Sequence, residues 1–428
     1  MSASKFRVIS HRVPSSYLRE FPRATANSPD DELQLSVKQY IPLSNPNPSP
    51  GDISLIGAHA NAFPKELYEP LWDDLLAESE KPNSKFKIRG IWIADLAHQG
   101  ESYVLNEQNL GNDPSWYDHP RDLLHIVNLF RKELPRPIFG VGHSVGGNNL
   151  TYASLFHPSL FQGLILLDPV IQPQSAELVK NSPILSPAAA STFRADLWES
   201  KEAALAGFKR SPFYQAWDPR ALSIFVEYGL RSLPTALYPD KNGKVTLTTP
   251  VGQEVYTFLR PNYQGYGWES GGKIDRRTHP DIDPESRVSA PFYRSEPPRT
   301  FRRLDEVRPS VFYLIGAESY VNSKELDIAR VRITGTGIGG SGGAAEGKVK
   351  SVTLQGVGHL LALEAPTEIA KLAAEWLGTE TENWRATEEE LKKNWYSKPL
   401  REKQAIDEDW KKAMGGPPKR RVKKQSNI

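Results

Sequence analysis

A serine flanked by glycines is the clearest chemical feature of the sequence. Gly142-His143-Ser144-Val145-Gly146 follows the apolar run 137–141 and opens a segment with helical character. A serine at such a strand-to-helix turn is held on a strained backbone with its hydroxyl exposed, and the glycines two positions before and after it leave room for the turn. The helix N-terminus also directs amide N–H groups at any oxyanion that develops nearby. The pattern predicts that Ser144 is a nucleophile.

A serine nucleophile needs a base that takes its proton and a carboxylate that orients the base. His359 is our candidate base, because it follows a predicted strand and a Gly-Val-Gly turn and precedes a loop that returns to a helix. His279 also lies far enough along the chain, but it falls in a loop and not at a strand end. Asp168 is our candidate acid, since it ends the buried apolar strand that follows the serine's helix. Glu318, after the next strand, is the alternative.

The oxyanion of a tetrahedral intermediate needs two N–H donors. The residue after the nucleophile, Val145, is expected to supply one. The second should come from the loop after the third strand, residues 59–64, where either Asn61 or Ala60 can donate and Asn61 is preferred. We expect His59 to brace this loop.

The segments around these residues predict an α/β fold with a mostly parallel, doubly wound sheet and an inserted cap. Strand-like and helix-like segments alternate, as such a sheet requires. The predicted strands cover residues 6–13, 33–40, 52–58, 86–96, 137–141, 163–169, 309–316 and 348–354. The predicted helices cover residues 65–79, 116–134, 144–156, 323–331 and 366–377.

The alternation breaks between residues 170 and 305, a stretch rich in proline, serine, arginine and aromatic residues. Its first part is helical in pattern, and the part after Tyr238 predicts short strands and loops, with aromatics at 263, 266 and 268. Ligands of doubly wound sheets bind outside the carboxyl ends of the strands, so an insertion that leaves from such an end should cover the site. We therefore divide the chain into a core (1–169 and 306–378), a cap (170–305) and a charged helical extension with a basic tail (379–428).

Composition excludes several classes of function. The chain has 428 residues and no cysteine, so it offers no thiolate nucleophile and no thiolate metal site, and we expect neither a metal nor a cofactor. A net charge of +2 argues against an extended nucleic-acid surface. No apolar run approaches the roughly 18 residues that span a bilayer, and we expect no signal peptide. The glycine-rich stretch 335–343 matches a dinucleotide pattern but leads into a strand, so we interpret it as a connecting loop.

Stretches distributed along most of the chain carry a resemblance to a known family: residues 64–72, 142–148, 166–169, 217–220, 300–304, 337–343 and 358–360. The chain resembles a group of fungal α/β-hydrolases that contains the peroxisomal acyl-CoA hydrolase of mycophenolic acid biosynthesis, the AK-toxin biosynthesis hydrolases and, more distantly, the yeast peroxisomal lipase. In that group the acid follows the strand after the serine's helix, which by resemblance supports Asp168 over Glu318. The resemblance also implies a cap over an acyl pocket, and a homodimer.

Members of the group usually end in a peroxisomal tripeptide of the Ser-Lys-Leu type, which an import receptor binds. This chain ends in Ser426-Asn427-Ile428 and lacks the middle basic residue, although a basic run precedes it at 419–424. We expect a peroxisomal location through that receptor, with the cytoplasm as the alternative.

These observations together predict a serine hydrolase of acyl thioesters, acting on a fatty or polyketide-derived acyl-CoA in secondary metabolism. The residues themselves do not distinguish a thioester from an oxygen ester. A carboxylesterase or lipase, or an acyltransferase with the same triad, is therefore the alternative. A non-catalytic binding protein of the same fold is the alternative from another class, and the ordered Ser, Asp and His argue against it.

Overall fold

The structure is a computed structural model that describes residues 2–173, 186–262, 276–282 and 292–416. The predicted aromatics at 263, 266 and 268 and the C-terminal tripeptide lie outside these residues. The chain divides into two compact units, Met1–Thr381 and Glu382–Ile428.

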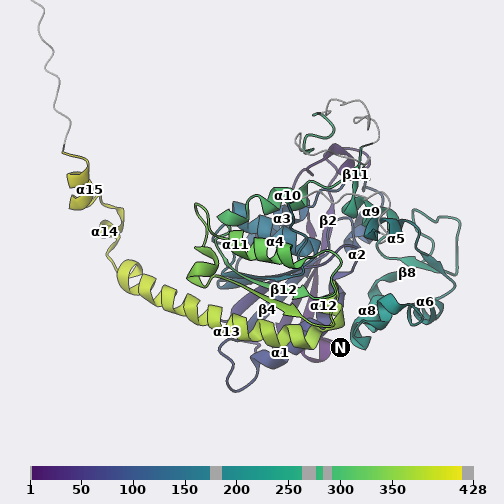
Figure 1. Ribbon diagram of the computed structural model, residues 1–428, viewed down its shortest axis with the longest axis horizontal. Helices are drawn as coiled ribbons and strands as arrows, with labels where there is room; N and C mark the ends of the chain where they lie inside the picture. Colours follow the sequence, from purple (N-terminus) through teal and green to yellow (C-terminus); the bar gives the residue numbers. More distant parts are fainter. Residues whose placement is uncertain (1, 174–185, 263–275, 283–291, 417–428) are drawn as a thin grey trace, which may run out of the picture. The chain divides into compact units, whose positions relative to one another are not determined.

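The first unit is built on an eight-stranded sheet (Figure 1). In spatial order its strands are β1 (Phe6–Pro14), β2 (Gln34–Pro42), β4 (Ile88–Ala94), β3 (Ile53–Ala58), β5 (Ile138–His143), β6 (Gly163–Leu167), β12 (Ser310–Gly316) and β13 (Val349–Leu354). β2 pairs antiparallel with β1 and β4, and the remaining pairs are parallel. The predicted mostly parallel sheet is confirmed.

Helices cover both faces of this sheet (Figure 1). One face carries α1 (Glu69–Ser79) and the first turns of α13 (Pro366–Leu391), whose Trp72 and Ile369 are fully buried. The other carries α3 (Asp118–Leu129) and α4 (Val145–Phe156). Every residue of β3, β5, β6 and β12 is buried, as expected for parallel strands covered on both sides. Their continuous apolar runs are what made them recognisable in the sequence.

The remaining helices of the core are short. They are α2 (Gly100–Asn106), α11 (Lys324–Ile333) and α12 (Leu361–Glu364). α13 continues past the predicted end at 377. Gly378 does not adopt the positive φ that ends many helices, and no proline follows it before Leu391. In the second unit, α14 (Leu400–Gln404) and α15 (Glu408–Ala413) are exposed. No helix of the described residues combines the length and apolar character needed to cross a membrane.

The segment between β6 and β12 forms its own small elements. They are α5 (Pro187–Thr192), β7 (Leu197–Trp198), α6 (Lys201–Phe208), α7 (Pro212–Gln215), α8 (Pro219–Tyr228), β8 (Leu230–Ser232), β9 (Val245–Leu247), α9 (Val251–Phe258), β10 (Arg260–Pro261), β11 (Phe292–Tyr293) and α10 (Glu296–Phe301). α9 differs from the predicted strands and loops after Tyr238. Its valines and glycine have low helix propensity, so the hydrogen bonds that α9 makes to Asn61, Gln99 and Trp116 of the core override local preference.

Aromatic residues of this segment pack mainly on one another. Phe208, Tyr214, Trp217 and Phe225 form a buried cluster with ring centroids 4.5 to 5.8 Å apart. The cluster meets the core at Phe63, whose ring centroid lies 5.4 Å from that of Trp217. These four aromatics are therefore part of a core cluster that the segment shares with one face of the sheet.

Candidate active site

Ser144 lies at the turn between β5 and α4, on a strained backbone. Its φ of 56° and ψ of −117° are outside the usual regions for a residue with a Cβ. The flanking glycines explain how this turn is packed. A Cβ on Gly142 would lie 2.6 Å from the carbonyl oxygen of Gly146, and one on Gly146 would lie 2.1 Å from that of Ala58. The glycines predicted to make room for the turn are thus required by backbone contacts on both sides.

The structure brings Ser144, His359 and Asp168 together. Nε2 of His359 lies 3.0 Å from Oγ of Ser144, and Nδ1 of His359 lies 2.5 Å from Oδ2 of Asp168. All three residues are buried. The carboxylate holds the imidazole proton on Nδ1, which leaves Nε2 to accept the serine proton. This arrangement can generate a serine nucleophile.

The loop after β12 supplies donors to Asp168 and not a second acid. The Ser319 hydroxyl donates to Oδ2 of Asp168, and the Asn322 amide donates to Oδ1. Glu318, the alternative acid, is exposed, and its backbone N–H bonds the carbonyl of Val357. Asp168 therefore accepts three hydrogen bonds, from His359, Ser319 and Asn322.

Arg330 on α11 supports this arrangement from behind. Its guanidinium donates to Oδ1 of Asn322 and to the carbonyls of Pro169 (2.9 Å) and Ile171 (2.7 Å). It thereby holds both the amide that contacts Asp168 and the backbone that follows Asp168. Ser319, Asn322 and Arg330 were not identified from the sequence. Their only signal was that the first two lie in the loop already considered for Glu318.

One amide in the loop after β3 has no hydrogen-bond acceptor among the described residues. The Ala60 N–H donates to the Tyr68 hydroxyl at 2.8 Å, whereas no described residue accepts a hydrogen bond from the N–H of Asn61 or of Val145. Asn61 and Val145 both line the cavity that contains Ser144. Of the two candidates in this loop, Asn61 is therefore the one with a free amide in the described structure.

His59 fixes the peptide that carries this amide. Its Nδ1 donates to the Ala60 carbonyl at 2.8 Å, and its Nε2 accepts from the Leu96 N–H at 3.0 Å. Burial lowers the pKa of His59, so the ring is neutral and has one donor and one acceptor, as these contacts require. The Ala60 carbonyl and the Asn61 N–H belong to the same peptide plane, which the histidine holds in one orientation.

Tyr68 and His143 connect this loop to the base. The Tyr68 hydroxyl donates to Nδ1 of His143 at 2.8 Å, and Nε2 of His143 donates to the His359 carbonyl at 2.9 Å. Burial lowers the pKa of His143 to about 3, so the ring stays neutral and keeps its proton on Nε2. Tyr68 was also missed from the sequence, because a tyrosine in a helical apolar pattern looks like ordinary core.

A cavity of about 260 Å³ opens at Ser144 and His359. Its walls are mostly apolar and come from the core and from the segment between β6 and β12: Trp116, Val170, Ala188, Phe258, Leu259 and Pro297. An apolar cavity of this kind suits a hydrocarbon chain whose reactive carbonyl reaches the serine.

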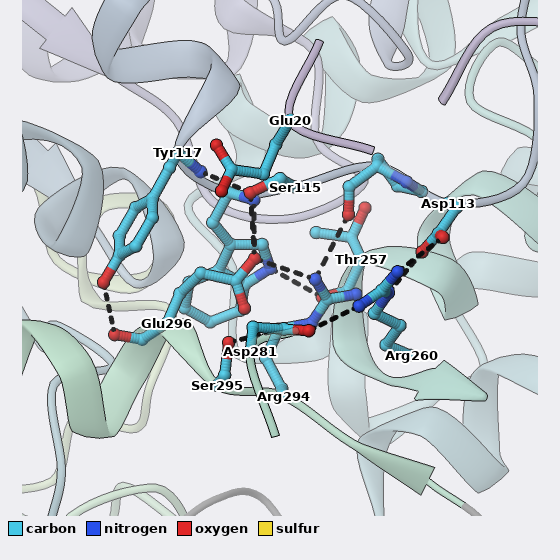
Figure 2. A network of polar contacts seen from close by, with 12 residues as sticks. Glu20, Asp113, Ser115, Tyr117, Thr257, Arg260, Asp281, Arg294, Ser295 and Glu296 are labelled. Carbon is cyan, nitrogen blue, oxygen red and sulfur yellow. Dashed lines mark hydrogen bonds and ion pairs between the residues drawn. The ribbon is translucent and has the colours of Figure 1, made fainter. Parts of the chain in front are cut away.

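Buried ion pairs lie next to the cavity residues Trp116 and Arg294, and Figure 2 shows their polar contacts. Arg294 lines the cavity and donates to Glu296 at 3.0 Å, and Glu296 accepts from the Trp116 N–H at 3.0 Å. Arg260 pairs with Asp113 at 2.6 Å and with Asp281 at 2.5 Å. These contacts attach the segment around β10 and β11 to the loop before α3. Within the described residues, no cluster of histidine and acidic side chains has the arrangement of a metal site.

The sequence and the fold are similar to those of known proteins. Residues 55–372 match the model of the alpha/beta hydrolase family. The chain is 41% identical to the type I acyl-CoA thioesterase mpaH of Penicillium roqueforti (strain FM164), over 94% of this chain and 97% of that protein. It is 39% identical to the type I acyl-CoA thioesterase mpaH' of Penicillium brevicompactum, over 99% of both.

Among solved structures, the peroxisomal alpha-beta-hydrolase Lpx1 of Saccharomyces cerevisiae has the same fold, with a TM-score of 0.63 and 17% identity over 96% of both chains. The predicted resemblance to fungal α/β-hydrolases is confirmed. The matched residues include the serine turn between β5 and α4 and both partners of Ser144. This chain belongs to the α/β-hydrolase family.

Proposed function

We propose that this protein is a serine-dependent acyl-CoA thioesterase. The observation that carries the proposal is the hydrogen-bonded chain from Asp168 through His359 to Ser144, which opens on an apolar cavity. The thioester specificity rests on the relatives, since two proteins about 40% identical over nearly the full length are named acyl-CoA thioesterases.

The geometry accounts for each step of the reaction. The Ser144 hydroxyl attacks the thioester carbonyl while Nε2 of His359 takes its proton, and Asp168 stabilises the imidazolium. The amides of Val145 and Asn61 hold the oxyanion. Collapse of the tetrahedral intermediate breaks the C–S bond, and His359 returns the proton to the departing thiol. Water then attacks the acyl-enzyme by the same route and releases the acid and Ser144.

The segment 170–305 acts as the cap of this site in our proposal. Ala188, Phe258, Leu259 and Pro297 come from it and form apolar walls for the acyl group. These walls suit the apolar acyl group, and the charged CoA moiety is expected to lie outside them.

Chemical labelling and a substrate panel test the proposal. A fluorophosphonate probe should label the wild-type protein and the control Ser159→Ala, a serine after α4 and away from the cavity, but not Ser144→Ala. Thiol release from acyl-CoAs of graded length should exceed hydrolysis of matched p-nitrophenyl and glyceride esters. Fast ester cleavage without release of CoA would make the protein a carboxylesterase or lipase, and labelling of Ser144→Ala equal to that of wild type would refute the serine mechanism.

The family resemblance further supports a homodimer and a peroxisomal location through the import receptor. Light scattering of the purified protein gives its mass in solution, and a monomer over the micromolar range would contradict the dimer. Imaging the chain with and without residues 426–428 tests whether this tripeptide directs the protein to the peroxisome. An unchanged diffuse distribution in both cases would favour the cytoplasm.

A further inference from the structure

A buried glutamine, Gln99, joins the loop of Asn61 to helix α9. The side chain is fully buried. Its Oε1 accepts from the N–H of Ala62 at 2.8 Å, and its Nε2 donates to Oδ1 of Asn61 at 2.7 Å and to the hydroxyl of Thr257 at 2.9 Å. One side chain thus contacts two successive residues of the loop and one residue of α9.

The loop needs such support. Ala62 has a φ of 70°, in the left-handed region that a residue with a Cβ rarely adopts. Nδ2 of Asn61 donates to the Glu254 carbonyl on α9 at 3.0 Å. Both the nitrogen and the oxygen of the Asn61 side-chain amide are therefore hydrogen-bonded. Removal of Gln99 would release Ala62 and one end of Asn61 together, while the Asn61 N–H must keep its direction to hold an oxyanion.

Helix α9 is itself tied to the core near the cavity. The Trp116 indole donates to the Thr257 carbonyl at 2.7 Å, and Arg294 donates to the carbonyl of Tyr256. Thr257 thereby joins the polar network of Figure 2. The residues that follow, Phe258 and Leu259, line the cavity. The helix that bears on the acyl pocket is thus hydrogen-bonded to the loop that carries the proposed oxyanion donor.

We propose that Gln99 is a positioning residue of the oxyanion site, which fixes the direction of the Asn61 N–H and links it to α9. This inference rests on the proposed function, because it assumes that an oxyanion forms at Ser144. Gln99 does not touch the substrate and acts through Asn61 and Ala62. Substitution of Gln99 should therefore destabilise the transition state and leave ground-state binding of the substrate unchanged. The reason is that the Asn61 N–H is used only when charge develops on the carbonyl oxygen.

Kinetics of Gln99→Met test the proposal, with Gln108→Met at an exposed site as the matched control. Removing one oxyanion donor outright costs about 100- to 1,000-fold in kcat. Because Gln99→Met only loosens the donor, we expect kcat to fall roughly 10- to 100-fold, with KM changed by less than about threefold. Gln108→Met should match the wild type. The substrate is whichever acyl-CoA or p-nitrophenyl ester the wild type cleaves fastest.

Inhibitor binding separates positioning from a merely structural role. An acyl trifluoromethyl ketone adds to Ser144 and places an oxyanion at the two amides, whereas the uncharged primary alcohol of the same chain length brings no negative oxygen to them. Gln99→Met should weaken the ketone in step with kcat and leave the alcohol unchanged. Equal loss of both affinities, or a kcat within about twofold of wild type, would overturn the proposal.

Gln99→Glu and Thr257→Val, with Thr257→Ser as the rescue of the second, keep the test decisive if Gln99→Met does not fold. Gln99→Glu retains an oxygen that faces Ala62 but sets a carboxylate oxygen against Oδ1 of Asn61, so the same split between ketone and alcohol is expected. Thr257→Val removes the partner on α9, and Thr257→Ser should restore it. If neither variant lowers kcat, the proposal is wrong. Failure of the proposed function would appear differently, as a wild-type protein that neither reacts with the fluorophosphonate nor cleaves any ester.

Discussion

Three buried histidines should make the folded state sensitive to mild acid. His98, His119 and His143 are buried, and burial lowers the pKa of each to about 3. In the unfolded chain a histidine titrates near 6.5. The unfolded state therefore binds protons below that pH while the folded state does not, so stability is present above about pH 6.5 and is lost as the pH falls toward the folded pKa.

The size of the effect follows from this difference. At pH 5.5 the unfolded state gains about 1.4 kcal/mol per histidine from protonation, and at pH 7 about 0.2, so each residue costs about 1.2 kcal/mol between the two. The folded pKa of about 3 lies far enough below 5.5 that the folded state takes up almost no proton. Together the three should lower the free energy of unfolding by nearly 4 kcal/mol.

His119→Phe isolates one of these contributions. Neither ring nitrogen of His119 has a hydrogen-bond partner among the described residues, so the variant removes a titrating group without breaking a bond. Urea unfolding at pH 7 and 5.5 measures the pH-dependent loss, which should be about 1.2 kcal/mol smaller in His119→Phe. His157→Phe at an exposed position is the control. An equal loss in His119→Phe and wild type would show that this histidine does not carry the acid sensitivity.

Further predictions concern the site and its supports. Asp168→Asn should lower kcat by about 10³- to 10⁴-fold because the amide no longer holds the His359 proton on Nδ1, while Glu318→Gln changes kcat by less than about twofold; an equal loss in both would contradict the assignment. Tyr68→Phe leaves the Ala60 N–H without its acceptor, and chemical unfolding should show a loss of about 1 to 3 kcal/mol. Arg260→Leu removes the buried guanidinium from Asp113 and Asp281, and chemical unfolding should show a loss of about 3 kcal/mol; a much smaller loss would show that these two ion pairs do not hold the segment in place.

Much of the fold was predictable because its signals are local. The strands of a parallel sheet buried on both faces are continuous apolar runs, so the predicted strand at 52–58 matches Ile53–Ala58 and that at 163–169 contains Gly163–Leu167. Helix α9 was not predictable in this way. It depends on hydrogen bonds from Asn61, Gln99 and Trp116, which lie 141 to 193 residues away in the sequence.

In the candidate site, too, some residues were predictable from local sequence and others depended on packing. Ser144 and His359 were identified from glycine spacing and strand ends, which are steric requirements of a few neighbouring residues. The choice between Asp168 and Glu318 was not local, because both follow a strand and only the packing decides which one faces His359.

The sequence by itself determined the sheet, the serine turn and the order of the candidate nucleophile, acid and base, since backbone sterics and apolar periodicity act over short spans. The tertiary structure alone decided which carboxylate meets His359, that Tyr68 occupies the Ala60 N–H, and that Gln99 ties the loop of Asn61 to α9. These are hydrogen bonds between buried polar groups far apart in the chain. Such groups show no periodicity, and their partners are set only when folding excludes water and leaves each donor the acceptors within its reach.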